Sequence, residues 1–418
     1  MEAGSSAGCT VAGPGDRGAA QVPASRERGF WVVTCTLGLF LFAASAPSPL
    51  YRVYASSWHF SPTTLTEIFA VYAVALLITL LTAGSLSDAV GRRPVIVLGL
   101  AVQSLAMVGF LVANGAAWLF AARITQGVAT GLVTAAVAAA LIDLQPENPP
   151  GRGALVNAIT PAFGLALGAL VSGALVQYGP APTRLIYALL LGGFVILAGT
   201  LAMVPETVTG RHRPSFSVRL GVDRSVRPRF VSALPCLIAT WALGGLYLSL
   251  GPSIIEGLAG STNRFLGGTV VTLLAGAGGT ASWVARNWPP RRAMLIGCAA
   301  LTTGVTVSVI GVASGEAAIF YVGTGIAGIG FGTAFLGAFR VLVSVASAES
   351  RAALVASIYV VAYLAFSVPA VIAGLSTTHF GLKDTSIAYG AVIAALSLAA
   401  IPAMSLMDRR LPDTDPQR

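Results

Sequence analysis

Apolar residues in this chain gather in long runs, and short segments that hold most of the charged residues separate these runs. Each run is close to the ~20 residues that an α-helix needs to cross a bilayer. We predict twelve spans, at 30–50, 63–83, 94–113, 117–141, 153–177, 184–204, 230–255, 265–285, 293–313, 317–346, 352–376 and 386–407. Only helices and closed barrels satisfy every backbone group in lipid, and these runs are too long for barrel strands. The pattern therefore predicts an all-α membrane protein.

A polar segment midway along the chain divides the twelve predicted spans six against six. The residues before the first span are rich in Gly, Ala, Ser and Pro, and terminal segments of this kind are commonly disordered. We therefore expect five parts: a disordered cytoplasmic tail (1–29), a first six-helix half (30–204), a basic cytoplasmic linker (205–229), a second six-helix half (230–407) and a second cytoplasmic tail (408–418).

Charged residues make up 10% of the chain, against about 25% in soluble proteins. When successive loops are assigned to alternate sides, nineteen of the 25 basic residues fall on one side and four on the other. This bias is the positive-inside pattern, so we expect both termini in the cytoplasm. The same bias explains the net charge of +9, so the lipid bilayer rather than nucleic acid is the expected partner.

The loop between the second and third spans reads Gly84-Ser-Leu-Ser-Asp88-Ala-Val-Gly91-Arg92-Arg93. Its glycines allow a tight turn, and its arginines hold the loop to an anionic membrane face. The pattern resembles the loop between spans 2 and 3 of the major facilitator superfamily of secondary transporters. An ordinary basic turn explains the arginines but neither the acid nor the glycines. The resemblance implies a gating motif of Gly84, Asp88, Gly91, Arg92 and Arg93, within a fold of two six-helix halves.

An arginine lies inside the fourth span, where a charge is costly and indicates a functional site. Arg123 is followed by Gln126 and Gly127. This segment resembles a second signature of the superfamily, which links the arginine to proton movement. The alternative is an arginine that extends to the outer surface, because Arg123 lies only a turn or two from that end. We expect Arg123 and Gln126 to serve proton coupling or substrate binding.

Proton coupling needs a titratable acid on the transport path. Glu67 lies one turn into the second span, where an acid near a helix N-terminus is stabilising in any case. Glu256 ends the seventh span near the outer face. We keep Glu67 as the candidate, although neither acid lies clearly at the middle of the membrane.

A second set of charges follows the fourth span, at Asp143, Glu147 and Arg152. The Glu147 to Arg152-Gly153 segment resembles an acidic-then-Arg-Gly loop of the superfamily. Together with Asp88 and Arg92, we expect these residues to form a cytoplasmic charge cluster that holds one conformation closed. Interaction of each charge with a helix dipole is the simpler alternative.

Small residues recur where helices are expected to pack closely, at Gly127, Gly131, Gly164, Gly168 and Gly173. Export members of the superfamily carry a Gly-rich signature in the fifth span that includes a Gly-Pro dipeptide, and this chain has the glycines without the dipeptide. Aromatic residues mark the seventh and eleventh spans, where they either line a cavity or pack against other helices: Trp241, Tyr247, Tyr359 and Tyr363.

The resemblance implies a secondary transporter with protons as the coupling ion. The use of Arg in place of Lys and the abundance of Ala, Gly and Val indicate a GC-rich bacterial genome, so we expect the plasma membrane of a bacterium. We expect proton-coupled export of a small amphipathic drug or metabolite by a monomer, and the alternative is uptake of a sugar or organic acid. No metal, cofactor or enzymatic activity is expected. The three histidines lie in different loops, and the sequence contains neither H-E-x-x-H nor a G-x-x-x-x-G-K-[ST] ATP-binding motif.

Overall fold

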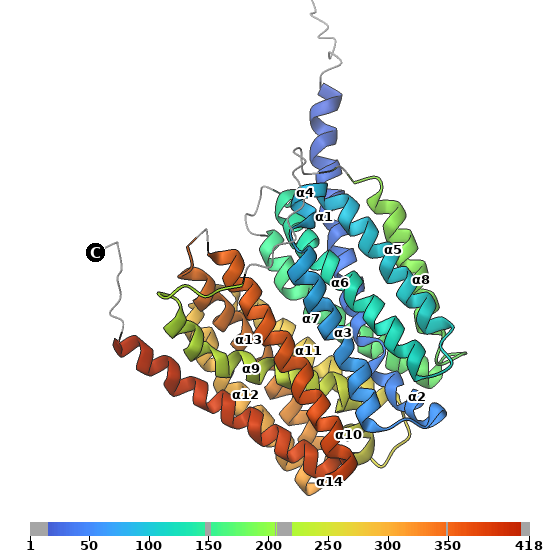
Figure 1. Cartoon of the computed structure of the whole chain (residues 1–418), viewed down its shortest axis with the longest axis vertical. Helices are drawn as coiled ribbons and strands as arrows, with labels where there is room; N and C mark the ends of the chain where they lie inside the picture. Colours follow the sequence, from blue (N-terminus) through green and yellow to red (C-terminus); the bar gives the residue numbers. More distant parts are fainter. Residues whose placement is uncertain (1–15, 147–151, 205, 207–219, 348–349, 411–418) are drawn as a thin grey trace, which may run out of the picture.

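The computed structural model describes residues 16–146, 152–204, 206, 220–347 and 350–410, and within these ranges it is helical with no strand. Figure 1 shows the helices as two neighbouring bundles, which we call the first and second groups. The first group contains α1 (Asp16–Ser45), η1 (Ser48–Leu50), α2 (Tyr51–Trp58), α3 (Pro62–Ala83), α4 (Leu86–Val90), α5 (Arg92–Leu111), α6 (Ala116–Leu144), α7 (Arg152–Tyr178) and α8 (Leu185–Leu201). The second group contains α9 (Arg227–Ser249), α10 (Gly251–Leu258), α11 (Phe265–Val284), η2 (Ala285–Asn287), α12 (Pro290–Ser314), α13 (Ala317–Ser344) and α14 (Arg351–Arg410).

The helices follow the predicted apolar runs closely, with one clear difference at the start of the chain. Helix α1 begins at Asp16, so it extends into the segment 1–29 that we expect to be a cytoplasmic tail. Extending an existing helix avoids the cost of nucleation, and Ala, Gln, Glu and Arg in this segment favour helix.

Ten helices of the described chain are long and apolar enough to cross a membrane. Helix α8 is apolar but shorter. Helix α14 is interrupted at Gly381, whose φ of 80° and ψ of 165° are not helical, and Figure 1 shows the chain reversing direction near that end. The total of twelve spans and the cytoplasmic location of both termini therefore stay predictions.

Two helices are broken near prolines at corresponding places in the two groups. Helix α1 ends at Ser45, and η1 and α2 continue the chain beyond Pro47. Helix α9 ends at Ser249, and α10 starts at Gly251 with Pro252 in its first turn. Proline lacks an N–H and clashes with the preceding turn, which explains both breaks. They place α2 and α10 at the same end of the molecule (Figure 1).

Each group is held by its own helix contacts, and two helix pairs make the most extensive contacts between the groups. In the first group α1 packs on α7, and α6 packs on α3 and α5. In the second group α12 packs on α13, and α9 packs on α14. Between the groups, α7 packs on α11 and α3 packs on α14.

Glycines permit the close helix approaches in the first group. A Cβ on Gly127 would overlap the carbonyl oxygen of Tyr72, and one on Gly131 would lie 2.7 Å from that of Leu76, so the backbones of α6 and α3 approach closely. Helix α7 approaches α1 in the same way.

A Cβ on Gly164 would lie 2.7 Å from the carbonyl oxygen of Gly38, and one on Gly168 would meet that of Phe42. Further along α7, Gly173 faces Gly268 of α11 in the second group, with 3.2 Å between its added Cβ and the Cα of Gly268. These approaches suit the packing role expected for the glycines.

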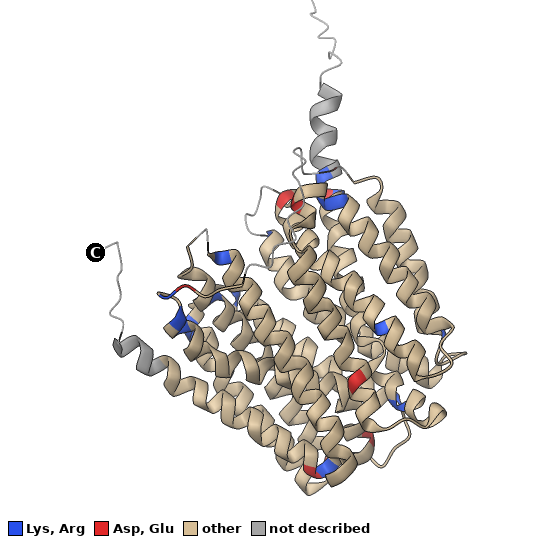
Figure 2. Ribbon diagram, in the orientation of Figure 1, with Lys and Arg blue, Asp and Glu red and all other residues tan. Residues whose placement is uncertain are grey.

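Charged residues gather at the two ends of the bundle, and the helices between them are largely uncharged (Figure 2). We call the end that carries α4 and the residues Asp88, Arg92 and Asp143 the motif end. We call the opposite end, which carries Arg52, Glu256 and Arg264, the clamp end.

Candidate functional site

Arg123 is buried inside the first group with only 1% of its surface exposed, so it does not extend to the outer surface. Its Nη1 donates hydrogen bonds to Oε1 of Gln126 at 2.7 Å and to the carbonyl oxygen of Ala44 at 3.3 Å. Gln126 in turn donates from Nε2 to the carbonyl oxygen of Ala43 at 3.0 Å. The arginine and the glutamine therefore tie α6 to the last turn of α1, directly before the proline break.

Aromatic rings enclose the guanidinium from the other sides. Its Cζ lies 4.7 Å from the ring centroid of Tyr72, 5.7 Å from that of Tyr51 and 5.9 Å from that of Phe69. Ring faces stabilise a cation that is removed from water. Two buried polar groups here, Nε of Arg123 and the hydroxyl of Tyr51, have no hydrogen-bond partner in the described part of the chain. The site thus holds a positive charge and two unused polar atoms.

The aromatic surface continues into the second group. Phe69 of α3 lies 4.8 Å from Phe366 of α14, and Phe366 lies 5.9 Å from Trp241 of α9. Tyr363 lies 5.1 Å from Trp241 and packs against the buried cluster that contains Tyr72. We call Phe69, Trp241, Tyr363 and Phe366 the aromatic wall. It joins the surroundings of Arg123 to the second group.

The other two aromatic candidates differ from one another. Tyr359 lies next to Tyr363, with 6.1 Å between ring centroids, so it extends the aromatic wall along α14. Tyr247 is buried in the core of the second group, where it stacks on Phe320 and its hydroxyl bonds to Thr324 at 2.8 Å. Tyr247 is therefore a packing residue in this structure rather than a lining residue.

Glu67 lies in the first turns of α3 and is half-buried. The four ion pairs found among the described residues do not include it, and none joins it to Arg123. The structure therefore gives Arg123 aromatic rings and carbonyl oxygens as neighbours instead of a carboxylate.

The gating motif folds into the short helix α4 and a turn at Gly91. The φ of Gly91 is 116°, a value that only glycine adopts easily, and an added Cβ would lie 2.6 Å from Oε2 of Glu206. At Gly84 an added Cβ would lie 2.5 Å from the carbonyl oxygen of Leu80. Both glycines are thus required by the turn.

Arg92 is the centre of the charge network at the motif end. Its guanidinium pairs with Asp88 through Nη1 and with Oδ2 of Asp143 at 3.4 Å through Nε. Arg26 donates a hydrogen bond to the carbonyl oxygen of Asp143 at 2.9 Å. The structure brings together Asp88, Arg92 and Asp143 of the expected cluster. Glu147 lies outside the described residues, and Arg152 stacks on the ring of Trp31 at 5.9 Å.

Glu206 is part of this network, and the sequence reasoning missed it. Its two carboxylate oxygens accept hydrogen bonds from the backbone N–H groups of Arg92, at 2.9 Å, and Arg93, at 3.0 Å. A carboxylate at the first N–H groups of α5 satisfies donors that the helix itself leaves unpaired. The signal in the sequence was a single acid directly after the sixth span.

The clamp end contains an ion bridge between the groups. Oε2 of Glu256 accepts hydrogen bonds from Nη1 of Arg52 at 3.0 Å and Nη1 of Arg264 at 2.6 Å. Ser48 donates to the carbonyl oxygen of Leu248 at 2.7 Å in the same region. Arg52 and Ser48 belong to the first group, and Glu256 and Leu248 to the second, so both contacts cross between groups. In the sequence Arg264 lies 8 positions after Glu256, so a local signal existed for that pairing, whereas Arg52 lies 204 positions before the acid.

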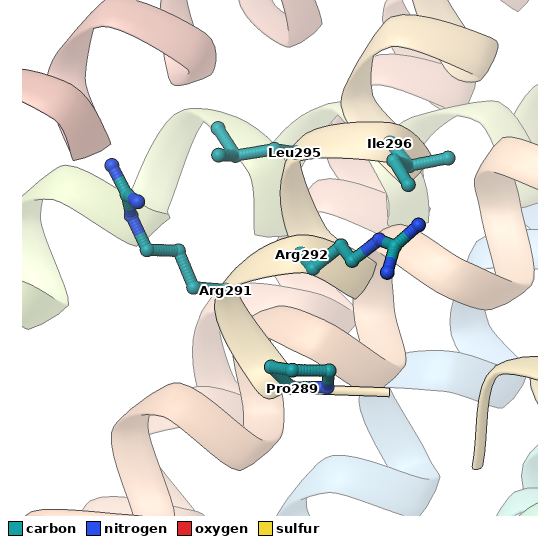
Figure 3. A pocket seen from close by; sticks show the side chains of 5 residues that line it. All are labelled: Pro289, Arg291, Arg292, Leu295 and Ile296. Carbon is teal, nitrogen blue, oxygen red and sulfur yellow. The ribbon is translucent and has the colours of Figure 1, made fainter. Parts of the chain in front are cut away.

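The first turn of α12, which carries an Arg-Arg pair as the gating motif does, borders a surface pocket of ≈370 Å³. Pro289, Arg291, Arg292, Leu295 and Ile296 line it. Figure 3 shows the two arginine side chains pointing away from each other, and Arg292 lies 5.5 Å from the ring of Trp288. The two guanidinium groups do not converge on one ligand, and neither Arg123 nor a residue that contacts it lines the pocket.

A model of the Major Facilitator Superfamily matches residues 33–370, most of the chain. The chain belongs to this superfamily. It is also similar to the uncharacterized MFS-type transporter Rv1250 of Mycobacterium tuberculosis, with 30% identity over 114 residues. That match spans 27% of this chain and only 20% of the length of the relative.

Solved structures of transporters share the superfamily fold. A bacterial homolog of the human lysosomal transporter Spinster, in an inward-facing and unoccupied conformation, aligns with a TM-score of 0.77 and 14% identity over 93% of this chain and 99% of that one. A variant of the nucleoside transporter NupG aligns with a TM-score of 0.69 and 10% identity, over 90% of this chain and 99% of that one. Membership of the superfamily indicates a multi-pass membrane transporter rather than an enzyme.

Proposed function

We propose that this chain is a secondary active transporter that exports a small amphipathic drug or metabolite in exchange for protons, by alternating access. The observation that carries the proposal is the buried Arg123 beside the aromatic wall. Rings that reach from α3 to α9 and α14 offer an apolar compound contacts on both groups, and the guanidinium supplies one fixed charge. An intramembrane charge of this kind marks a substrate or proton pathway.

The proposed topology has twelve spans in two six-helix halves, with both termini in the cytoplasm of a bacterium and the protein a monomer in the plasma membrane. Counting α8 as the sixth span and the two limbs of α14 as separate spans gives this number. The positive-inside bias supports the orientation, and it places the motif end at the cytoplasm and the clamp end outside. With the clamp end bridged, the proposed conformation faces inward.

Uptake of an organic acid is the second candidate. In its favour, no carboxylate is among the described partners of Arg123, so an anionic substrate would supply the missing negative charge. A sugar has no such advantage at this site.

The test is proton release from inside-out vesicles with an acidic interior, followed with a pH-sensitive dye. Cationic and neutral lipophilic compounds and aromatic carboxylates are added in turn. A transported compound releases the gradient in the wild type. A charge-assisted hydrogen bond contributes about 1.5–3 kcal/mol, so Arg123→Ala should slow the release about 10- to 100-fold.

Arg340→Gln is the matched control. Arg340 also lies in a span, but it donates to the backbone carbonyl oxygens of Arg286 and Trp288 at the motif end, and its loss should leave the rate unchanged. If no compound releases the gradient, export is rejected, and labelled organic acids in right-side-out vesicles test the second candidate.

A further inference from the structure

Glu256 is the one acid with a buried side chain in the described part of the chain. One of its oxygens, Oε2, accepts hydrogen bonds from Arg52 and Arg264. The other oxygen, Oε1, is buried and has no hydrogen-bond partner among the described residues. The residue lies in α10, beyond the break that ends α9 and outside the helices long enough to span the membrane. It is therefore a carboxylate kept from water at the boundary of the two groups.

The two arginines lie on different sides of that boundary. Arg264 directly precedes α11 and belongs to the second group with Glu256. Arg52 lies on α2 in the first group, and its side chain is 44% exposed. Of the two ion pairs of Glu256, only the one with Arg52 has to break when the groups part. The other bonds that cross nearby, such as Ser48 to Leu248 and the N–H of Arg264 to Oε1 of Gln177 at 2.8 Å, involve no titratable group.

The contacts that bury Glu256 come from its own group. A Cβ on Gly267 of α11 would lie 3.5 Å from Oε1 of Glu256, and Pro252 lies against the same glycine. These residues stay with Glu256 when the groups separate. Parting the groups therefore removes a positive charge from the carboxylate while much of its burial persists.

The direction of proton linkage follows from this arrangement. Burial raises the pKa of Glu256, and the charges of Arg264 and Arg52 lower it by less. Loss of Arg52 on opening raises the pKa further, so the open form binds a proton more tightly than the closed form. Acidification through the pH range between the pKa values of the closed and open forms therefore favours opening.

In the described part of the chain, Arg264 and Arg52 are the charges that act on the carboxylate, whereas Glu316, directly before α13, and Lys383 and Asp384 on α14 are exposed to solvent. The helices packed against α10 are α9, α11, α13 and α14, and their titratable side chains in the shared core are Tyr247, Tyr321 and Tyr389. These phenols are neutral in the physiological range, and each makes a hydrogen bond elsewhere.

We propose that Glu256 is a proton-binding gate residue: its carboxylate holds the clamp end closed through Arg52, and protonation releases Arg52 so that the two groups part there. The two guanidinium groups that share one oxygen then repel each other, which favours separation. The proposal rests on the alternating access of the proposed function. It implies that acidity on the outer side opens the exit.

The experiment measures a distance across the clamp end without substrate. Native cysteines are replaced, spin labels are attached at Ser57→Cys on α2 and Thr262→Cys before α11, both exposed positions, and the protein is studied in nanodiscs by pulsed electron resonance. In the wild type the ratio of open to closed forms should rise as pH falls, by up to about tenfold per pH unit, the limit for one proton. Glu256→Gln should be open at a pH where the wild type is closed, and its response to pH should be lost.

Arg52→Gln provides a second variant at an exposed position, and it should give the same open distance. The control is Glu316→Gln, an exposed acid before α13, which should keep the wild-type distance and pH response. A closed clamp end in folded Glu256→Gln and Arg52→Gln, or an unchanged pH response in Glu256→Gln, overturns the proposal. Because no substrate is present, that result would leave proton-coupled export to be decided by the vesicle assay.

Discussion

The two ends of the molecule use the same kinds of residue for different purposes. At the motif end, the contacts of Arg92 with Asp88 and Asp143, and those of Glu206 with the start of α5, all lie within the first group or the segment directly after it. At the clamp end, the bond between Arg52 and Glu256 joins the two groups. In this conformation the motif-end charges shape one loop, and the clamp-end charges hold two bodies together.

A cluster of charged residues therefore does not by itself identify a gate between the two groups. The motif-end network is partly exposed, and exposed ion pairs contribute about 0–1 kcal/mol. Glu256 has no exposed side-chain surface. Its interaction with Arg52 exists only while the groups touch, so it acts on the conformational equilibrium instead of on local folding.

The largest effects are expected from two substitutions on α7. One lies at a contact within the first group, and the other lies at a contact between the groups. Gly168→Val would overlap Phe42 of α1, and overpacking of this kind destabilises by about 1–3 kcal/mol. Gly173→Val would meet Gly268 across the group boundary, so it should open the clamp end with little change in thermal stability. Thermal unfolding and the clamp-end distance measure the two effects.

Gly192→Val is the control for this pair, since an added Cβ there has no neighbour within 4 Å. It should behave as the wild type in both measurements. Equal losses of thermal stability in Gly168→Val and Gly173→Val would show that the two groups are a single packed body. That result would contradict the distinction between contacts within a group and contacts between the groups.

A smaller effect is expected when one arginine at each end is replaced by an uncharged residue. Arg92→Gln should lower the free energy of unfolding by no more than about 1 kcal/mol and leave the clamp-end distance unchanged, because its partners belong to the same group. Arg52→Gln should lengthen the clamp-end distance. If Arg92→Gln opened the clamp end as far as Arg52→Gln does, the motif end would also be holding the groups together.

Much of the fold was readable from the sequence because apolar runs of membrane length have few alternatives to helix. The matches at α3, α6, α7 and α13 show this. The motif loop was readable too, since Gly91 needs a backbone conformation that few residues adopt. The burial of Arg123 was one of two alternatives that the sequence left open, the other being an arginine that extends to the outer surface.

The remaining features depend on residues that are distant in sequence. Glu206 meets Arg92 across more than a hundred positions, and Glu256 meets Arg52 across about two hundred. A pattern of neighbouring residues in the sequence cannot predict contacts over such separations. Tyr247 and Tyr363 look alike in a helical sequence, and only the packing of the second group shows that the first is in its core and the second in the aromatic wall.

The most direct test of the account is the distance at both ends under the same conditions. A second labelled protein carries Val90→Cys on α4 and Ala352→Cys at the start of α14, one exposed position in each group at the motif end. As acid opens the clamp end, the motif-end distance should shorten in an equal fraction of molecules, since the groups rock as bodies. A clamp end that opens while the motif-end distance stays unchanged would contradict alternating access.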